Sequence, residues 1–164
     1  MYYSKIAKGY NSLHGEEQLN KLKIIAKILK VTKETSLLDV GCGTGISTYY
    51  FDCDCTGLDP CKELIEQNPS KLILGRAEEL PFENDSFDVV ISVTAIHNFE
   101  DYRKGLEEMY RVSKNGGQVA LSILRKANDF EKISSLINEI FGEVQQIEES
   151  KDIIFYNTNL FKRA

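Results

Sequence analysis

The chain has 164 residues, of which 42% are hydrophobic, so we expect one globular domain, 1–164, that buries roughly 70% of its unfolded surface. Its formal net charge of −5 disfavours broad electrostatic binding to nucleic-acid backbones. No apolar run approaches the roughly 18 residues of a membrane span and the first residues lack a secretion signal, so we expect a cytoplasmic protein without membrane contact.

The N-terminal part, 1–31, predicts an aromatic-rich tail followed by an amphipathic helix. Tyr2, Tyr3 and Tyr10 gather in the tail. Apolar residues recur at helical spacing over 16–31, before the first strand. These residues are Leu19, Leu22, Ile25 and Leu29.

The run Leu-Leu-Asp-Val-Gly-Cys-Gly-Thr-Gly over 37–45 joins an apolar strand to a glycine-rich turn. Glycine adopts positive φ without strain and lets the backbone approach a ligand closely. Residues 46–51 then open a short helix whose free N–H groups attract an anionic group. The turn therefore predicts a nucleotide-like ligand, with Cys42 serving as a small residue rather than a nucleophile.

The residues around this turn select among nucleotide ligands. A dinucleotide fingerprint has glycine where this chain has Ile46, and the Gly-Lys-Ser/Thr ending of a phosphate loop is absent. The carboxylate of Asp39 would repel a pyrophosphate and attract an ammonium group. S-adenosylmethionine carries an ammonium and a sulfonium and has no phosphate, so its functional groups match the pattern.

Further apolar segments follow, each ending near polar or glycine residues. They are 56–60, 71–75, 87–93 and, after the turn Asn115-Gly116-Gly117, 118–124. Asp59 ends the first of them, where a second parallel strand would present a carboxylate to a ribose. Asp88 begins the 87–93 strand and is expected to be a structural hydrogen-bonding partner.

The C-terminal part, 125–164, predicts a helix and two strands. Apolar spacing indicates helices over 102–112 and 128–141. The segments 144–148 and 153–156 are separated by a gap too short for a crossover, so they must pair antiparallel. With the alternating strands and helices of the 36–124 core, this predicts an α/β fold: a three-layer, doubly wound, mostly parallel seven-stranded sheet with an antiparallel C-terminal hairpin.

Six motifs in order resemble those of the class I S-adenosylmethionine-dependent methyltransferases. They are LLDVGCGTG, TGLDP, RAEELPF, SFDVVIS, AIHNF and KNGGQVALSIL. Within the class the chain is similar to the ubiquinone/menaquinone-biosynthesis branch, methyltransferase type 11, from about Tyr2 to Leu124. The ordered set is far more specific than one glycine turn. It implies a Rossmann-like methyltransferase fold, with S-adenosyl-L-methionine as cofactor and S-adenosyl-L-homocysteine as product.

The resemblance also implies a contact for each part of the cofactor. Asp39 with Gly41, Cys42, Gly43 and Gly45 would hold the methionine portion, Asp59 and Pro60 the ribose, Ala77 and Glu78 the adenine edge, and Thr94 the region of the reactive methyl group.

Two further features bear on this assignment. In the resembling family an aromatic N-terminal segment folds over the cofactor, which makes Tyr10 the candidate for a lid; packing on the core surface is the alternative. The family often has aspartate where this chain has Arg76, so Glu78 or a backbone carbonyl would meet the adenine amino group.

Methyl transfer from a sulfonium is an in-line displacement that needs few protein groups, because the cofactor carries the reactivity. A base is required only when the acceptor must lose a proton. His97 follows the fourth strand at the carboxyl edge of the sheet, beside the reactive methyl by the same likeness, and is the candidate base. A loop-packing role for His97 stays open.

The sequence thus predicts a methyltransferase whose acceptor, a small molecule or a macromolecule, is unidentified. The Asn/Asp-Pro-Pro-aromatic motif of amide and exocyclic-amine methylation is absent, since Ser92-Val-Thr-Ala95 stands there. A non-catalytic cofactor-binding subunit that stabilises or activates a partner protein is the alternative. A dinucleotide-binding oxidoreductase is disfavoured by Ile46 and Asp39. A homodimer or an activating partner would complete an open acceptor site.

The four cysteines raise the question of a metal. Cys53, Cys55 and Cys61 lie close together in sequence, but no Cys-x-x-Cys pair occurs, and His14 and His97 are far apart. We therefore expect free thiols and no metal site.

Overall fold

The computed structural model describes residues 10–162, with side chains from residue 15 onward. Seven strands form one sheet in the order β3-β2-β1-β4-β5-β7-β6. Neighbouring strands pair parallel, except that β7 runs antiparallel to both β5 and β6. Their bounds are β1 Ser36–Val40, β2 Asp54–Asp59, β3 Leu72–Leu74, β4 Phe87–Val93, β5 Ser113–Leu124, β6 Gln145–Glu148 and β7 Asp152–Asn157. The predicted mostly parallel sheet with its C-terminal hairpin is confirmed.

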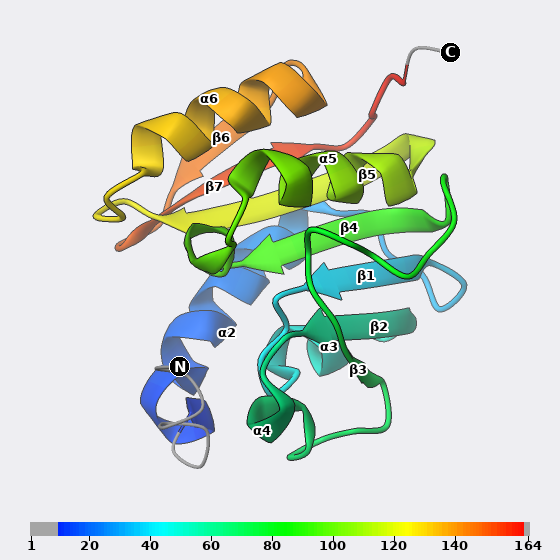
Figure 1. Cartoon of the computed structure of the whole chain (residues 1–164), viewed down its shortest axis with the longest axis vertical. Coiled ribbons are helices and arrows are strands. Elements are labelled where there is room, and N and C mark those ends of the chain that lie inside the picture. The colour runs from blue at the N-terminus through cyan, green and yellow to red at the C-terminus, as the bar shows by residue number, and fades with distance from the viewer. Residues whose placement is uncertain (1–9, 163–164) are drawn as a thin grey trace.

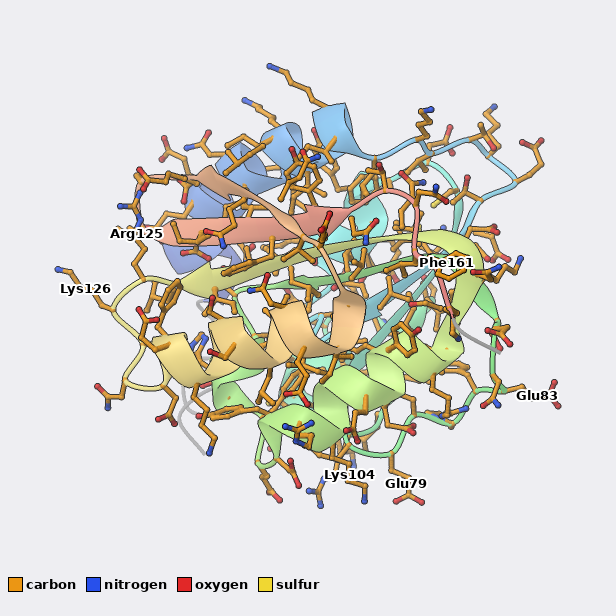
Figure 2. All side chains as sticks on the ribbon, turned by 90° about the horizontal axis from the view of Figure 1, so that it is seen from above. Glu79, Glu83, Lys104, Arg125, Lys126 and Phe161 are labelled. Atoms are coloured by element: carbon orange, nitrogen blue, oxygen red, sulfur yellow. The ribbon has the colours of Figure 1, made fainter. Side chains whose placement is uncertain are left out.

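Helices cover both faces of the sheet. They are α2 Tyr10–Ile28, α3 Ile46–Tyr50, α4 Lys62–Ile65, the 3-10 turn η2 Ile96–Asn98, α5 Tyr102–Val112 and α6 Phe130–Phe141. Figure 1 shows α5 and α6 on one face, and the view from above in Figure 2 shows α2 on the other. The apolar clusters divide in the same way, so the fold has the three layers predicted.

The alternation of side chains along β1 explains these layers. Leu37 packs with the α2 cluster, whereas Leu38 and Val40 pack with the α5 and α6 cluster. Parallel strands of this kind are buried on both faces, which is why β1 and β4 are apolar almost throughout. None of the helices within 10–162 combines the length and the apolar character needed to cross a bilayer.

The predicted bounds of the first helix and of β5 differ most from the structure. The first helix begins at Tyr10 rather than at residue 16, and Leu19, expected on its inner face, is 42% exposed. The buried face of α2 contains Gln18, Lys21, Leu22 and Ile25, and Leu29 continues it just after the helix. Successive helical residues are about 100° apart, which turns Leu19 outward.

The predicted turn over 115–117 lies inside β5. Ser113 pairs with Phe87 and Gln118 pairs with Val89, so residues 114–117 form an irregularity in the strand opposite Asp88. Gly116 has φ of +78° there. The sequence therefore indicated a local change in backbone direction. The strand continues beyond it because Phe87 and Val89 of β4 pair with β5 before and after the irregularity.

Asp88 has the structural role predicted for it. Its carboxylate accepts hydrogen bonds from the Ser36 amide at 2.9 Å and the Ser36 hydroxyl at 3.0 Å, and the ammonium of Lys114 donates to it at 3.0 Å. The Ser36 amide, with help from Lys114, lowers the pKa of Asp88 below its ordinary 3.8. The group thus joins the starts of β1, β4 and β5.

We expect Asp88→Asn to lower the free energy of unfolding by about 1 kcal/mol at pH 7, a modest cost because the side chain is 41% exposed. A carboxyl whose folded pKa is depressed stabilises the fold above its unfolded pKa. The difference between the two proteins in urea unfolding should therefore be constant above about pH 5 and shrink as the pH falls below 3.8 toward the lower folded pKa. A difference that persists unchanged at pH 3 would contradict the assignment.

Candidate functional site

A cavity of about 310 Å³ lies at the carboxyl ends of β1, β2 and β4. The structure brings seven of the predicted cofactor residues to its wall: Gly41, Gly43, Asp59, Pro60, Ala77, Glu78 and Thr94. The wall also contains residues to which the sequence assigned no role: Leu58, Cys61, Leu64, Ala95, Asn98, Phe99 and Glu100. Most of these residues follow β2 or β4. In open α/β sheets, ligands bind at the carboxyl ends of the strands where the strand order reverses, so a position just after such a strand is the signal that would have found them.

The glycine turn requires glycine for steric reasons at two positions. Gly41 has φ of +77°, and a Cβ built on it would lie 2.4 Å from the Cβ of Ala95. Gly45 has φ of +91° at the start of α3, and a Cβ there would lie 2.8 Å from the Tyr49 ring. The turn thus passes close to the loop after β4 and leaves its backbone on the cavity wall.

Asp59 connects the end of β2 to the glycine turn. One carboxylate oxygen accepts from the Gly43 amide at 3.0 Å and the other from the Cys61 amide at 2.8 Å. The residue is 8% exposed, and burial raises its pKa above the ordinary value. Each oxygen has a second lone pair, so the group retains capacity for two ligand hydroxyls.

Asp39 lies behind the turn rather than on the cavity wall. It is fully buried, and its Oδ2 accepts from the hydroxyls of Ser47 at 2.5 Å and Thr48 at 2.8 Å. Its Oδ1 has no hydrogen-bond partner among the described residues. Burial raises the pKa of Asp39 from 3.8 to about 6, although the two hydroxyls oppose the shift. The carboxylate therefore fastens α3 beneath the glycine turn.

The segment after β3 forms the next part of the wall. Ala77 is 5% exposed and Glu78 8% exposed, and the Oε2 of Glu78 is buried without a partner among the described residues. Arg76, which stands where the resembling family often has aspartate, forms an ion pair with Glu100 at 2.6 Å. Arg76, the only cation among the described residues of the wall, is thus neutralised, while Asp59 and Glu78 leave this part of the cavity acidic.

Thr94 closes the wall after β4 in a strained conformation. Its φ of +53° is unusual for a β-branched residue and costs on the order of 1–3 kcal/mol. Its hydroxyl donates to Asp152 at 2.7 Å and accepts from the Lys21 ammonium at 2.9 Å. Lys21 and Asp152 are themselves a buried ion pair at 3.4 Å, with side chains 5% and 0% exposed. This polar cluster joins α2, the loop after β4, and β7.

His97 does not line this cavity. It lies in η2 and faces a second cavity, which shares Thr94 with the first. Its Nδ1 is buried without a partner among the described residues. Burial lowers the pKa of His97 below its ordinary 6.5, with opposing effects from Asp152, which raises it, and Lys21, which lowers it. The imidazole is therefore neutral at pH 7 and able to accept a proton.

Three further predicted residues have other places. Gly45 shapes the turn as described, and Cys42, 5% exposed, packs with Ile65 and Leu72 while burial raises the pKa of its thiol. That shift opposes a nucleophilic role. The side chain of Tyr10 and all of the preceding tail lie outside the described residues, so the lid remains a prediction.

The cysteines are all buried and free. The thiols of Cys53 and Cys55 lie 3.0 Å apart at the start of β2. No group of three or more His, Cys, Asp or Glu side chains within the described part of the chain is arranged to hold a metal ion.

Comparison with known proteins identifies the family. A methyltransferase-domain family model matches residues 38–121, which is half of the chain, so the chain belongs to this family. The demethylmenaquinone methyltransferase of Listeria welshimeri is 33% identical over 138 residues, covering 72% of this chain and 58% of that protein. The family and branch predicted from the ordered motifs are confirmed. The chain spans little more than half the length of the curated relatives it matches.

Solved structures share the fold. An S-adenosyl-L-methionine-dependent methyltransferase from Methanococcus maripaludis superposes with a TM-score of 0.79 at 17% identity, covering 98% of this chain and 94% of that one. A chain from the complex between the Haloferax volcanii Trm112 methyltransferase activator and a methyltransferase gives a TM-score of 0.78 at 17% identity, covering 96% and 97%. At these identities the likeness concerns the architecture.

The buried charge of Asp39 gives a prediction for stability. Between its unfolded pKa of 3.8 and its folded pKa of about 6, the native state loses stability as the pH rises, because only the unfolded chain ionises freely. Asp39→Asn removes this penalty, so we expect it to be more stable than the wild type by about 1–3 kcal/mol at pH 8, with the gain disappearing below pH 4. Urea unfolding at several pH values measures the difference. A variant less stable at pH 8 would show that hydrogen bonds to the charged form outweigh its burial.

Proposed function

We propose that the chain is a methyltransferase domain that binds S-adenosyl-L-methionine in the cavity at the ends of β1, β2 and β4. The observation that carries the proposal is the acidic character of that cavity beside a glycine-rich turn. Asp59 and Glu78 lie on its wall and Arg76 is paired with Glu100. A cationic sulfonium ligand gains from such a field, whereas the phosphates of a dinucleotide would be repelled.

The individual groups fit the parts of the cofactor. Asp59 keeps lone pairs for the two ribose hydroxyls, and the buried Oε2 of Glu78 can accept from the adenine amino group. Leu58, Leu64 and Phe99 supply an apolar wall for the base. Gly41 and Gly43 let the methionine portion approach the backbone, and Asp39 supports that turn from behind. When bound, the cofactor would supply an activated methyl group, and the chain would position it.

His97 supports the chemistry on the acceptor side. A neutral imidazole next to the cavity that shares Thr94 with the cofactor cavity is placed to take a proton from an acceptor hydroxyl or ammonium. It lies in a turn fixed by the η2 backbone, where the Phe99 amide donates to Ile96 O and the Asn98 amide to Ala95 O. We assign His97 the role of base on these grounds.

Two further predictions from the sequence remain proposals. One is that the chain forms a homodimer or binds an activating partner, and the other is that it is cytoplasmic. For the partner, a chain of similar fold was solved with a methyltransferase activator. A requirement for a partner would show as cofactor binding without turnover by the isolated chain.

The cofactor assignment predicts ligand-dependent stability. S-adenosyl-L-methionine and S-adenosyl-L-homocysteine should each raise the melting temperature in a concentration-dependent way, and NAD should not, because only a ligand that binds the native state stabilises it. Asp59→Ala should weaken cofactor binding by about 1–3 kcal/mol in calorimetry, since a charged hydrogen-bond acceptor is lost. The exposed Glu83 provides the matched control, and Glu83→Ala should bind as the wild type does. A preference for NAD would overturn the proposal.

The role of His97 predicts a specific change in kinetics. With an acceptor that must lose a proton, His97→Ala should lower kcat by roughly 10²–10⁴-fold and leave cofactor affinity unchanged. The wild-type pH profile of kcat should fall on its acidic side below pH 6.5, because burial lowers the pKa of His97, and this limb should vanish in the variant. If His97 merely packs the loop, the variant will retain the limb.

A further inference from the structure

A second cavity, of about 610 Å³, lies between α2, the η2 turn, the loop after β5 and the loop before β7. Thr94 is the one described residue that lines both cavities. If the first cavity holds the methyl donor as proposed, an acceptor in the second cavity would meet it beside Thr94. The position of the second cavity therefore makes it the acceptor site, an inference that rests on the proposed function.

The inner end of this cavity contains polar atoms without partners. Gln18 is 9% exposed, and its Oε1 is buried without a hydrogen bond to any described residue. The same is true of the Nδ1 of His97. Buried polar atoms are normally satisfied, and leaving two unsatisfied costs free energy. A ligand that donates hydrogen bonds at this end would satisfy Gln18 and the neutral imidazole.

The outer end carries three cations, two of which are paired with carboxylates. Arg125, Lys126 and Lys151 lie there, and Glu17 is the only acidic residue on the described wall. Glu17 pairs with Lys151, and Arg125 lies 3.6 Å from Glu148 while donating to the backbone oxygen of Glu149.

Lys126 forms no ion pair with a described residue, and Figure 2 shows it projecting beside Arg125. Of the cations on the described wall, Lys21, Arg125 and Lys151 each have a carboxylate partner, so Lys126 supplies the positive charge that remains uncompensated at the mouth.

We infer that the acceptor is a small anionic molecule with a protic nucleophile, an O–H or N–H group. Its carboxylate or phosphate is held by Arg125 and Lys126, and its nucleophile lies at Gln18 and His97, next to Thr94. The acceptor oxygen or nitrogen forms the bond to the methyl carbon, the carbon–sulfur bond breaks with its electron pair left on sulfur, and the acceptor proton passes to His97. Cationic residues at the mouth attract such a molecule and orient it.

The first test uses labelled methyl groups. The full chain is incubated with methyl-labelled S-adenosyl-L-methionine and extract of the source cells, separated into protein, nucleic acid and small molecules. The labelled product should be a small molecule retained by an anion-exchange resin, and phosphatase treatment should tell a phosphate from a carboxylate. Label in a neutral or cationic small molecule, or in a macromolecule, overturns the inference and leaves the proposed function standing. Cofactor binding with no label in any fraction overturns the inference together with the methyl-transfer part of the proposed function, and leaves the cofactor assignment standing.

The second test uses variants at the cavity mouth and the purified acceptor. Arg125→Gln/Lys126→Gln should raise the KM for the acceptor about five- to thirtyfold while kcat and the KM for the cofactor stay within twofold, because two partly exposed charge contacts are lost. The control is Lys33→Gln/Lys104→Gln, which makes the same change in net charge at exposed positions away from the cavity. Equal effects of the two double variants would show that only net charge matters and would overturn the site.

Discussion

The hydrogen bond from the Gly43 amide to Asp59 is the contact on which the geometry of the candidate site depends. It joins the turn after β1 to the end of β2, and the Gly41 and Cys42 amides, which both donate to Leu58 O at 2.8 and 3.0 Å, reinforce the junction. Asp39 holds α3 against the same turn from the opposite side. Two carboxylates thus fix one short loop between them, and the loop in turn forms the floor of the first cavity.

This arrangement has an energetic cost. Burial raises the pKa of both Asp39 and Asp59, which means that the fold keeps two acids in an environment that disfavours their charge. The strained backbone of Thr94 adds to the cost. Strain and buried charge of this kind persist where many surrounding contacts hold the residues in place, and they are concentrated at functional sites. A cationic ligand would relieve the electrostatic part, because an opposite charge nearby favours the ionised carboxylates.

Local patterns in the sequence predicted the parts of this fold whose causes are local. The bounds of β4 and α5 match the prediction, because apolar runs and helical periodicity report burial directly. Asp59 lies on the cavity wall because it ends a parallel strand at the edge of the sheet, a position that the sequence shows directly.

Contacts between distant segments could not be predicted in this way. Lys21, Thr94 and Asp152 come from three parts of the chain that only the sheet order brings together, and a lysine on an amphipathic helix is ordinarily exposed. Likewise the pairing of Arg76 with Glu100 depends on how the loops after β3 and β4 meet. Sequence therefore located the first cavity but gave no sign that its boundary with the second is held by a buried ion pair.

That ion pair holds Thr94, the described residue that the two cavities share. Removing either partner from a buried pair leaves an uncompensated charge, so Lys21 and Asp152 hold each other and, through the Thr94 hydroxyl, the loop after β4. Asp152 raises the pKa of His97 and Lys21 lowers it, so their effects oppose each other. Burial is the main influence on this pKa and lowers it. If His97 is the base that we propose, a neutral imidazole beside this fixed residue would take the acceptor proton without a rearrangement of the loop after β4.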